Sequence, residues 1–339
     1  MMTSHFAGRD GFPAAISIGD PDTRRPDNFV RVKIVGSAAG GGFPQWNCNY
    51  RLSRAARAGV TGIYPRTQSS LAISADGTGW VLFNASPDIR QQIAQTPELQ
   101  PATDAPLRSS PIKAVVLTNA DVDHIAGLLS LRERQPFAIY ATAQVLGAIA
   151  ANPIFGVLDP AVVPRRELPD DEFEICDAEG LGTGIRIEAF AVPGKVALFL
   201  EDVSRPDANY GSEAGDTIAI RLAGRAGRSL FYVPGCARVD ADLQRRLAGA
   251  ACLLFDGTVY TDDEMISAGV GQKTGQRMGH LAMAGKTGSI ASLAGVDIGR
   301  RIFVHINNTN PVLDGNSPEY AVVTAAGWDV AFDGMEIAL

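Results

Sequence analysis

Short runs in which apolar and polar residues alternate recur along the chain, and this period predicts β-strands. The first run, FVRVKIVG at 29–36, is rich in β-branched residues and leads into a glycine-rich loop, SAAGGGFPQWNCNY. Two more runs, at 66–74 and 79–86, are separated by turn residues at 76–79. This arrangement predicts a hairpin or meander.

A mixed pattern follows in the first half. Residues 113–118 form an apolar run that predicts a buried strand, and 124–134 place apolar residues at helical spacing. A short polar loop separates the two. A further strand is predicted at 137–142 and a helix at 143–152.

The second half repeats this style, with short strands before late helices. Strands are predicted at 184–194, 196–203, 216–224, 229–235, 251–258, 300–305 and 328–339, and helices at 243–250 and 320–327. Two strand-rich halves predict an α/β (α+β) fold in which two sheets pack face to face with helices outside. No linker-like composition divides 29–339, which is expected to be one domain. Residues 1–28 lack apolar periodicity and are predicted to be a partly disordered extension.

Composition narrows the class of protein. The 339 residues are 46% hydrophobic, enough for a sizeable core, and the net charge is −7, which argues against a nucleic-acid binder. We find no apolar run long enough to span a bilayer and no secretory signal, so a cytoplasmic protein without membrane insertion is expected. The four cysteines are far apart and are predicted to be reduced, mostly buried thiols.

Candidate chemistry gathers where predicted strands end, at Asp121, Asp123, His124, Asp256 and His305. Histidine and carboxylate ligands together suit zinc, iron or manganese. Each residue also has an ordinary explanation, such as a helix cap for an aspartate or a structural hydrogen bond for a histidine. Their joint occurrence favours a metal site.

The segment VVLTNADVDHIAGLLSL resembles the metal loop of the metallo-β-lactamase superfamily, Thr-His-x-His-x-Asp-His-x-x-Gly. Thr118, Asp123, His124 and Gly127 match this motif, whereas Asn119 and Asp121 replace its first two histidines. Two later residues match the superfamily's bridging aspartate and last histidine, namely Asp256 and His305. The segment around His280 is similar to a Gly-His helix start in the tRNA-processing and phosphonate-degrading branches. The resemblance implies a metallo-β-lactamase-like four-layer αββα sandwich.

A more extensive resemblance, from Phe29 to Leu339, is to the coenzyme PQQ synthesis protein B family. It rests on GSAAGGGFPQWNCN, RTQSS, NASPDIR, DDEM, MGH, HINNTNP and AFDGM. Many members carry three cysteines after the glycine-rich loop, where this chain has Cys48, Tyr50 and Ser53, so we do not expect that zinc site here. The resemblance implies a role in making pyrroloquinoline quinone (PQQ), a cofactor built from glutamate and tyrosine side chains of a precursor peptide.

Ligand counting favours one of the two roles assigned to this family, an iron oxygenase that hydroxylates the tyrosine ring of a Glu–Tyr intermediate. The chain has four histidines, one of them in the extension, which is too few for a two-metal hydrolase. Two histidines and one carboxylate with open positions are the arrangement of non-haem Fe(II) oxygenases. We expect His124 and His305 as nitrogen ligands and Asp123 or Asp256 as the carboxylate, with Asp121 in reserve. Iron (Fe²⁺) is the expected metal, with zinc or manganese as alternatives.

Other residues are candidates for contact with the substrate. His280 is either an acid/base group or a structural histidine, and both readings stay open. Arg66 and Arg90 could anchor an anionic substrate or form structural salt bridges. Asn307 and Asn308 could hold substrate carboxylates or satisfy loop backbone.

Two other functions remain as alternatives. One is a soluble carrier of the cofactor or its precursor that assists transport to the periplasm, and the other is a metal-dependent hydrolase. The expected partners are the PQQ precursor, as a small molecule or a peptide derivative, and other proteins of PQQ biosynthesis.

Overall fold

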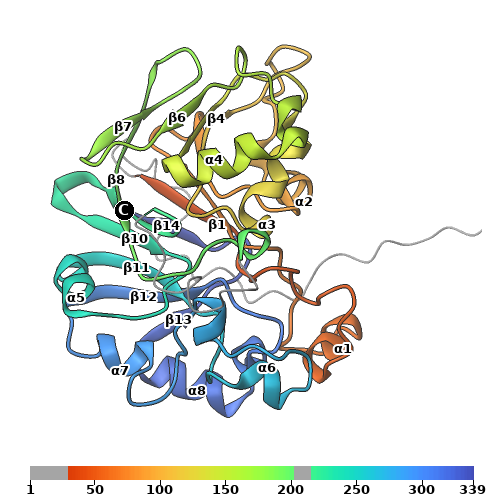
Figure 1. Cartoon of the computed structure of the whole chain (residues 1–339), viewed down its shortest axis with the longest axis vertical. Coiled ribbons are helices and arrows are strands. Elements are labelled where there is room, and N and C mark those ends of the chain that lie inside the picture. The colour runs from red at the N-terminus through yellow and green to blue at the C-terminus, as the bar shows by residue number, and fades with distance from the viewer. Residues whose placement is uncertain (1–29, 202–214) are drawn as a thin grey trace, which may run out of the picture.

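A computed structural model describes residues 30–201 and 215–339 (Figure 1). The predicted extension at 1–28 and the end of the predicted strand at 196–203 lie outside the described residues. Within the described part, no helix combines the length and the apolar character needed to cross a membrane.

The described strands form two seven-stranded sheets. The first sheet contains, in spatial order, β14 (Glu336–Ala338), β1 (Arg31–Gly36), β2 (Ser70–Ser74), β3 (Trp80–Phe83), β4 (Ile112–Val116), β5 (Ala138–Ala141) and β6 (Arg165–Glu167). The second contains β13 (Trp328–Val330), β12 (Ile298–Val304), β11 (Ala250–Asp256), β10 (Ser229–Val233), β9 (Ile218–Ala223), β8 (Gly182–Ala191) and β7 (Phe173–Cys176). Strands β3 to β6 run parallel to one another, as do β10 to β13. The predicted hairpin of β2 and β3 is confirmed, with Ala72 opposite Leu82.

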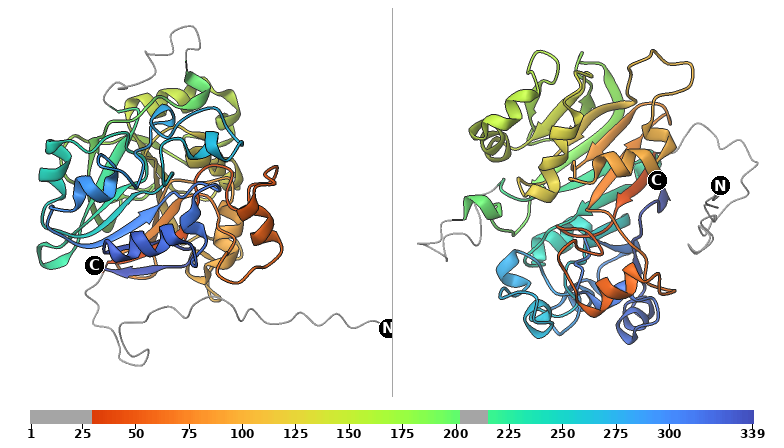
Figure 2. Two further views of the ribbon diagram at one scale, coloured as in Figure 1. Left: turned by 90° about the horizontal axis from the view of Figure 1, so that it is seen from below. Right: turned by 90° about the vertical axis from the view of Figure 1, so that its right-hand side faces the viewer.

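Helices occupy the connections. They are α1 (Arg51–Arg57), α2 (Ile89–Gln95), α3 (Val122–Ile125), α4 (Ala143–Ala151), α5 (Ala241–Leu247), α6 (Glu264–Ser267), α7 (Ser289–Leu293) and α8 (Pro318–Ala325). Figure 1 shows α2 and α4 on one outer side of the molecule and α5, α7 and α8 on the opposite side. The right-hand view of Figure 2 shows α1, early in the chain, among these C-terminal helices.

Three clusters of buried side chains account for this layering. One cluster joins residues of both sheets, such as Val116 and Tyr232, and therefore lies between them. A second joins the other face of the second sheet to helices, as Leu253 and Leu247 do, and a third does the same for the first sheet, as Val115 and Val145 do. Burial between successive layers is the hydrophobic driving force for this arrangement. The predicted four-layer αββα sandwich is confirmed.

The predicted helix at 124–134 is wrong in its extent. The structure has α3 over Val122–Ile125, and a 3₁₀ turn, Ala126–Leu131, follows it. The cause is a long-range pairing: the carbonyl of His124 accepts from the amide of Ala85 at 2.7 Å, and the amide of Gly127 donates to Ala85 at 2.8 Å. These groups are therefore unavailable to continue a regular helix.

Two strand predictions also need correction. The described part of 196–203 contains a 3₁₀ turn, Leu198–Leu200, because the amide of Leu198 donates to the Asp121 carboxylate at 2.9 Å. The closing run at 328–339 is two strands, β13 and β14, which belong to different sheets. The chain crosses between the sheets at 331–335.

Candidate metal centre

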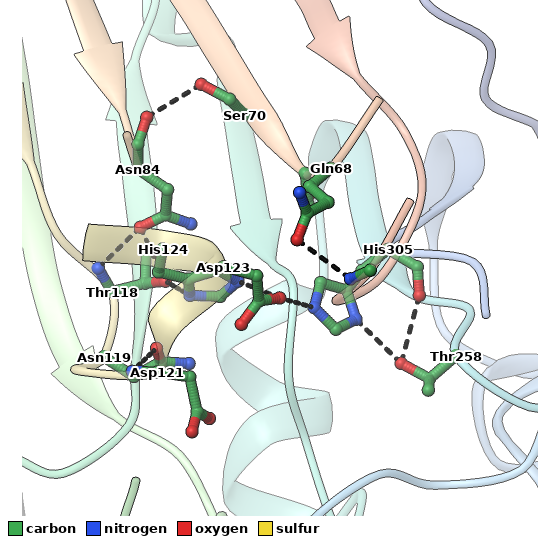
Figure 3. A network of polar contacts seen from close by, with 12 residues as sticks. Gln68, Ser70, Asn84, Thr118, Asn119, Asp121, Asp123, His124, Thr258 and His305 are labelled. Atoms are coloured by element: carbon green, nitrogen blue, oxygen red, sulfur yellow. Dashed lines mark hydrogen bonds and ion pairs between the residues drawn. The ribbon is translucent and has the colours of Figure 1, made fainter. Parts of the chain in front are cut away.

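Three candidate ligands converge between the ends of the two sheets. Asp123 and His124 lie on α3, directly after β4 of the first sheet, and His305 follows β12 of the second. Oδ2 of Asp123 lies 3.1 Å from Nε2 of His305 and 3.6 Å from Nε2 of His124. Figure 3 shows the Asp123 carboxylate between the two imidazole rings. Their donor atoms are close enough to bind one metal ion.

Local backbone contacts hold these residues in place. His305 has a φ of 56°, in the left-handed region that non-glycine residues rarely adopt. The next amide, of Ile306, donates to Ser37 at 2.9 Å and joins the end of β12 to the glycine-rich loop. In that loop, a Cβ on Gly40 would lie 3.4 Å from Cγ of Asp123, so the backbone passes close to the ligand. The glycine-rich loop therefore lies against the candidate metal centre.

The tautomer of His124 follows from its neighbours. Asn84 Oδ1 accepts hydrogen bonds from the amide and the hydroxyl of Thr118, at 2.9 and 3.1 Å. The hydroxyl hydrogen is thereby used, so Thr118 Oγ1 accepts from Nδ1 of His124, 3.2 Å away. Nε2 of His124 is then unprotonated, and it is buried without a hydrogen-bond partner among the described residues. An unpartnered buried imidazole nitrogen beside a carboxylate fits a metal ion.

Thr258 has the corresponding position beside His305. Its hydroxyl donates to Oδ1 of Asp256 at 2.6 Å and accepts from Nδ1 of His305 at 2.9 Å. Nε2 of His305 therefore faces Asp123 and the metal position. One threonine orients each histidine, from opposite sides of the site (Figure 3).

Asp256 is fully buried and has no free acceptor direction. Oδ1 accepts from the amide and hydroxyl of Thr258, while Oδ2 accepts from the amide of Cys236 at 3.0 Å and from Nδ1 of His280 at 2.8 Å. A carboxylate offers about four lone-pair sites, and all of them are used here. A second group of donors, Asp256, His280 and His305, also lies close together. Both oxygens of Asp256 and Nδ1 of His280 are engaged in these hydrogen bonds, so the geometry favours Asp123 over Asp256 as the carboxylate ligand.

Electrostatics support this assignment. Burial alone would raise the pKa of Asp123, but His124 and His305 outweigh burial and hold that pKa below its ordinary value. Burial lowers the pKa of His124, against the attraction of Asp123. For His305, burial acts to lower the pKa, but its hydrogen bond to Asp123 prevails and raises it. An ionised Asp123 and a neutral His124 are in the protonation states that bind metal.

The remaining predicted residues differ in their exposure and in their hydrogen-bond partners. Asp121, the reserve ligand, accepts from the amide of Leu198. Nη1 of half-buried Arg66 donates to the carbonyl of Ala331, and burial lowers the pKa of Arg66 to about 10 although nearby Asp333 acts to raise it. Arg90 is exposed on α2. The substrate contacts expected of both arginines stay predictions.

The two asparagines after His305 are buried. Nδ2 of Asn307 donates to Thr309 at 2.6 Å, and Nδ2 of Asn308 donates to Gln45 in the glycine-rich loop at 2.6 Å. Oδ1 of Asn308 has no hydrogen-bond partner among the described residues. Their side chains thus take part in loop contacts, and a role in binding substrate stays a prediction.

Sequence reasoning missed the threonines and Asn84. Thr118 was visible in the motif, and Thr258 stands two residues after Asp256, but a threonine near a strand end has no distinctive signal of its own. Asn84 carries one structural mark, a φ of 66° at a fully buried position. A backbone angle of this kind cannot be predicted from the sequence.

Residues 79–306 match the family model described as the beta-lactamase superfamily domain. The chain is 54% identical over 311 residues to coenzyme PQQ synthesis protein B of Methylorubrum extorquens (strain PA1), covering 91% of this chain and 100% of the relative. It is 56% identical over 311 residues to the protein of the same name from Methylobacterium nodulans, with the same coverage.

The chain belongs to the coenzyme PQQ synthesis protein B family. A crystal structure of Zn²⁺-bound PqqB from Methylobacterium extorquens superimposes with a TM-score of 0.85 at 54% identity and covers 91% of this chain and 100% of that one. A diphosphatase of the PhnP family superimposes with a TM-score of 0.64 at 16% identity, over 92% of this chain and 97% of that one, which shows a shared fold alone. The expected metallo-β-lactamase fold is therefore confirmed, as is the expected family.

Proposed function

We propose that this member of the coenzyme PQQ synthesis protein B family acts in PQQ synthesis as an iron-dependent oxygenase that hydroxylates the tyrosine ring of a Glu–Tyr precursor. Family membership supports the place in PQQ synthesis, because the relatives carry that name. The oxygen chemistry rests on the donor set described above.

The observation that carries the proposal is the composition of that set. Two imidazoles, each with Nε2 directed at one point, meet a single carboxylate, Asp123. Asp123, His124 and His305 would hold a ferrous ion with fewer protein ligands than its full coordination number, and such an ion would supply oxygen activation. The two donor groups among the described residues share His305, which supports one metal ion rather than the pair of a two-metal hydrolase.

The chain's own residues orient the ligands and offer an acceptor for a proton. Thr118 and Thr258 hold the imidazole rings of His124 and His305 in the tautomer that binds metal. His280 donates from Nδ1 to Asp256, which leaves its Nε2 as an acceptor for a proton from the tyrosine hydroxyl or ring. Asp256 then stabilises the charged imidazolium, because its carboxylate is buried beside it. Burial raises the pKa of Asp256, whereas the neighbouring His280 lowers it, and the resulting pKa of Asp256 lies below its ordinary value.

The test is reconstitution with Fe(II) without oxygen, followed by isotopically labelled dioxygen, ascorbate and a Glu–Tyr dipeptide. Mass spectrometry of the products should show labelled oxygen in the tyrosine ring. His124→Ala is the matched control and should bind little metal and form no product. Zn(II) loading should give a folded but inactive protein.

Two other results would replace the proposal. No oxygen gain, together with tight binding of the quinone to metal-free protein, would support a carrier. Turnover of phosphodiesters or thioesters with Zn(II) or Mn(II) would support a hydrolase.

We also propose that residues 29–339 act as one domain, because β14 near the C-terminus pairs with β1. The proposed setting is the cytoplasm, with other proteins of the same pathway as partners.

A further inference from the structure

A lysine that no motif singled out stands beside the candidate metal centre. Lys195 follows β8, and its side chain is 11% exposed. Its ammonium lies 3.7 Å from Oδ1 of Asp121 in the metal loop and 3.7 Å from Oε1 of Glu201. A largely buried ammonium requires compensating partners, and here these are carboxylates at the edge of the site.

The aliphatic stem of Lys195 is held against the segment that carries His280. A Cβ on Gly279 would lie 3.0 Å from Cγ of Lys195 and 3.4 Å from its Cβ and Cδ. Gly279 also has a φ of 86°, a conformation that glycine adopts readily. Glycine before His280 thus makes room for the lysine, which lies between the metal loop and the proposed acid/base group.

The ammonium has spare hydrogen-bonding capacity. It offers three donors, and among the described residues one goes to the carbonyl of Val196 at 3.0 Å. The carboxylates of Asp121 and Glu201 lie beyond normal hydrogen-bond length for N–H···O, about 2.7 to 3.2 Å. Donors remain for an incoming anion.

An anionic ligand needs a nearby cation at this site, because the surrounding side chains are carboxylates. Asp121, Asp123 and Asp256 surround the site, and like charges repel at short range. The second lysine at this edge, Lys273, is paired with Glu201 at 3.0 Å and is 38% exposed. Lys195 is therefore the buried cation best placed to offset the carboxylates.

We propose that Lys195 forms an anion subsite that binds a carboxylate of the substrate and orients it beside the metal. The class of ligand is a carboxylate-bearing molecule with an aromatic ring. The choice of a Glu–Tyr dipeptide as that ligand rests on the proposed function.

Exposed apolar side chains beside the subsite match the aromatic part of such a ligand. The bond from the Leu198 amide to Asp121 brings the turn Leu198–Leu200 to the metal loop. Leu198, Phe199 and Leu200 are 61%, 44% and 49% exposed, and Val122 in the metal loop is 58% exposed. Apolar groups next to a cation suit a ligand that is both aromatic and anionic.

The test is binding without turnover. Zn(II)-loaded protein is titrated calorimetrically, in the absence of oxygen, with L-glutamyl-L-tyrosine and with its diamide, L-glutaminyl-L-tyrosinamide, which keeps the α-amino group but lacks both carboxylates. Wild-type protein should prefer the dicarboxylate. Lys195→Met should weaken binding of the dicarboxylate by about 10- to 100-fold, the value of a hydrogen bond to a charged group, and leave diamide binding unchanged.

Two variants complete the design. Lys195→Arg should keep a preference for the dicarboxylate, because a guanidinium also pairs with carboxylates. Lys273→Met is the matched control: it removes the other cation beside Glu201 and should keep the wild-type preference. Metal content should be equal in all four proteins.

An equal loss for both ligands in Lys195→Met, no loss at all, or no binding of the dicarboxylate to wild-type protein would overturn the subsite. Because no oxygen is inserted in this experiment, its result is independent of whether iron-dependent hydroxylation is found.

Discussion

The hydroxyl of Thr118 lies 3.2 Å from Nδ1 of His124 and is committed as a donor to Asn84. This pair of contacts determines which nitrogen of His124 is free for a metal. Partners of this kind typically change metal affinity 10- to 100-fold when removed. We therefore expect Thr118 to influence the affinity of the candidate metal centre without being a ligand.

Thr118→Val should weaken metal binding by about 10- to 100-fold, because valine keeps the shape but cannot accept from Nδ1. Thr118→Ser should retain most of the affinity. The dissociation constant of Co(II) or Fe(II), measured by competition with a chelator, checks this. Equal affinity in the valine variant and the wild type would mean that the ring is oriented by packing alone.

Substitution of Asp123 and substitution of Asp256 should have different effects on metal binding. Asp123→Asn should lose most of the bound metal, because its carboxylate is the candidate ligand. Asp256→Asn should keep the metal, because all four acceptor directions of Asp256 are used by protein donors. Metal analysis of the two variants, purified without oxygen, decides the matter. The reverse pattern would assign the ligand to Asp256.

His280→Ala should keep the metal and lose turnover by roughly 10²- to 10⁴-fold, the usual contribution of a general acid or base. The measurement is the rate of oxygen incorporation at full iron occupancy. If the variant instead loses metal, His280 is a ligand and the second donor group is the true centre.

A buried carboxyl away from the centre gives a prediction for stability. Burial raises the pKa of Glu264 from 4.5 to about 7, although hydrogen bonds from Thr309 and the Tyr260 amide act to lower it. A raised carboxyl pKa means that the folded state holds a proton that the unfolded state releases. Stability from this group is therefore fully present below pH 4.5 and is lost as the pH rises to about 7.

Glu264→Gln should remove that pH dependence, because its amide can still accept from Tyr260 and can donate to Thr309. Urea unfolding should find the variant more stable than wild type at pH above about 7, by roughly 1 to 3 kcal/mol, and nearly equal at low pH. Parallel stability curves for the two proteins across this range would contradict the assignment.

Strand ends were the best guide to the site in the sequence. His124 and His305 each follow an apolar run, and the structure brings their rings to a centroid distance of 5.4 Å. The choice between Asp123 and Asp256 could not be made from sequence, because it depends on which hydrogen-bond donors surround each carboxylate. Lys195 also could not be predicted from the sequence as a site residue, because its proposed role depends on three segments that meet only in the folded chain.

The errors in the predicted secondary structure also arise from contacts that form only in the folded chain. The run at 328–339 is mostly apolar and looks like one strand. In the fold, the amide of Ala331 donates to Phe303 of the second sheet at 2.9 Å, whereas the amide of Gly334 donates to Ile34 of the first at 2.7 Å. Local periodicity contains no information about which sheet offers the partner.

The candidate ligands stand on two different sheets, so their spacing depends on how one sheet is positioned on the other. Tyr232 of β10 lies in the core between the sheets, and its hydroxyl lies 3.3 Å from Asn84 and 3.2 Å from Ser69 of the opposite layer. Asn84 in turn holds Thr118, which holds the ring of His124. A change at Tyr232 can therefore move one imidazole relative to the other. The packing of the central core would then help to set the geometry of the candidate metal centre.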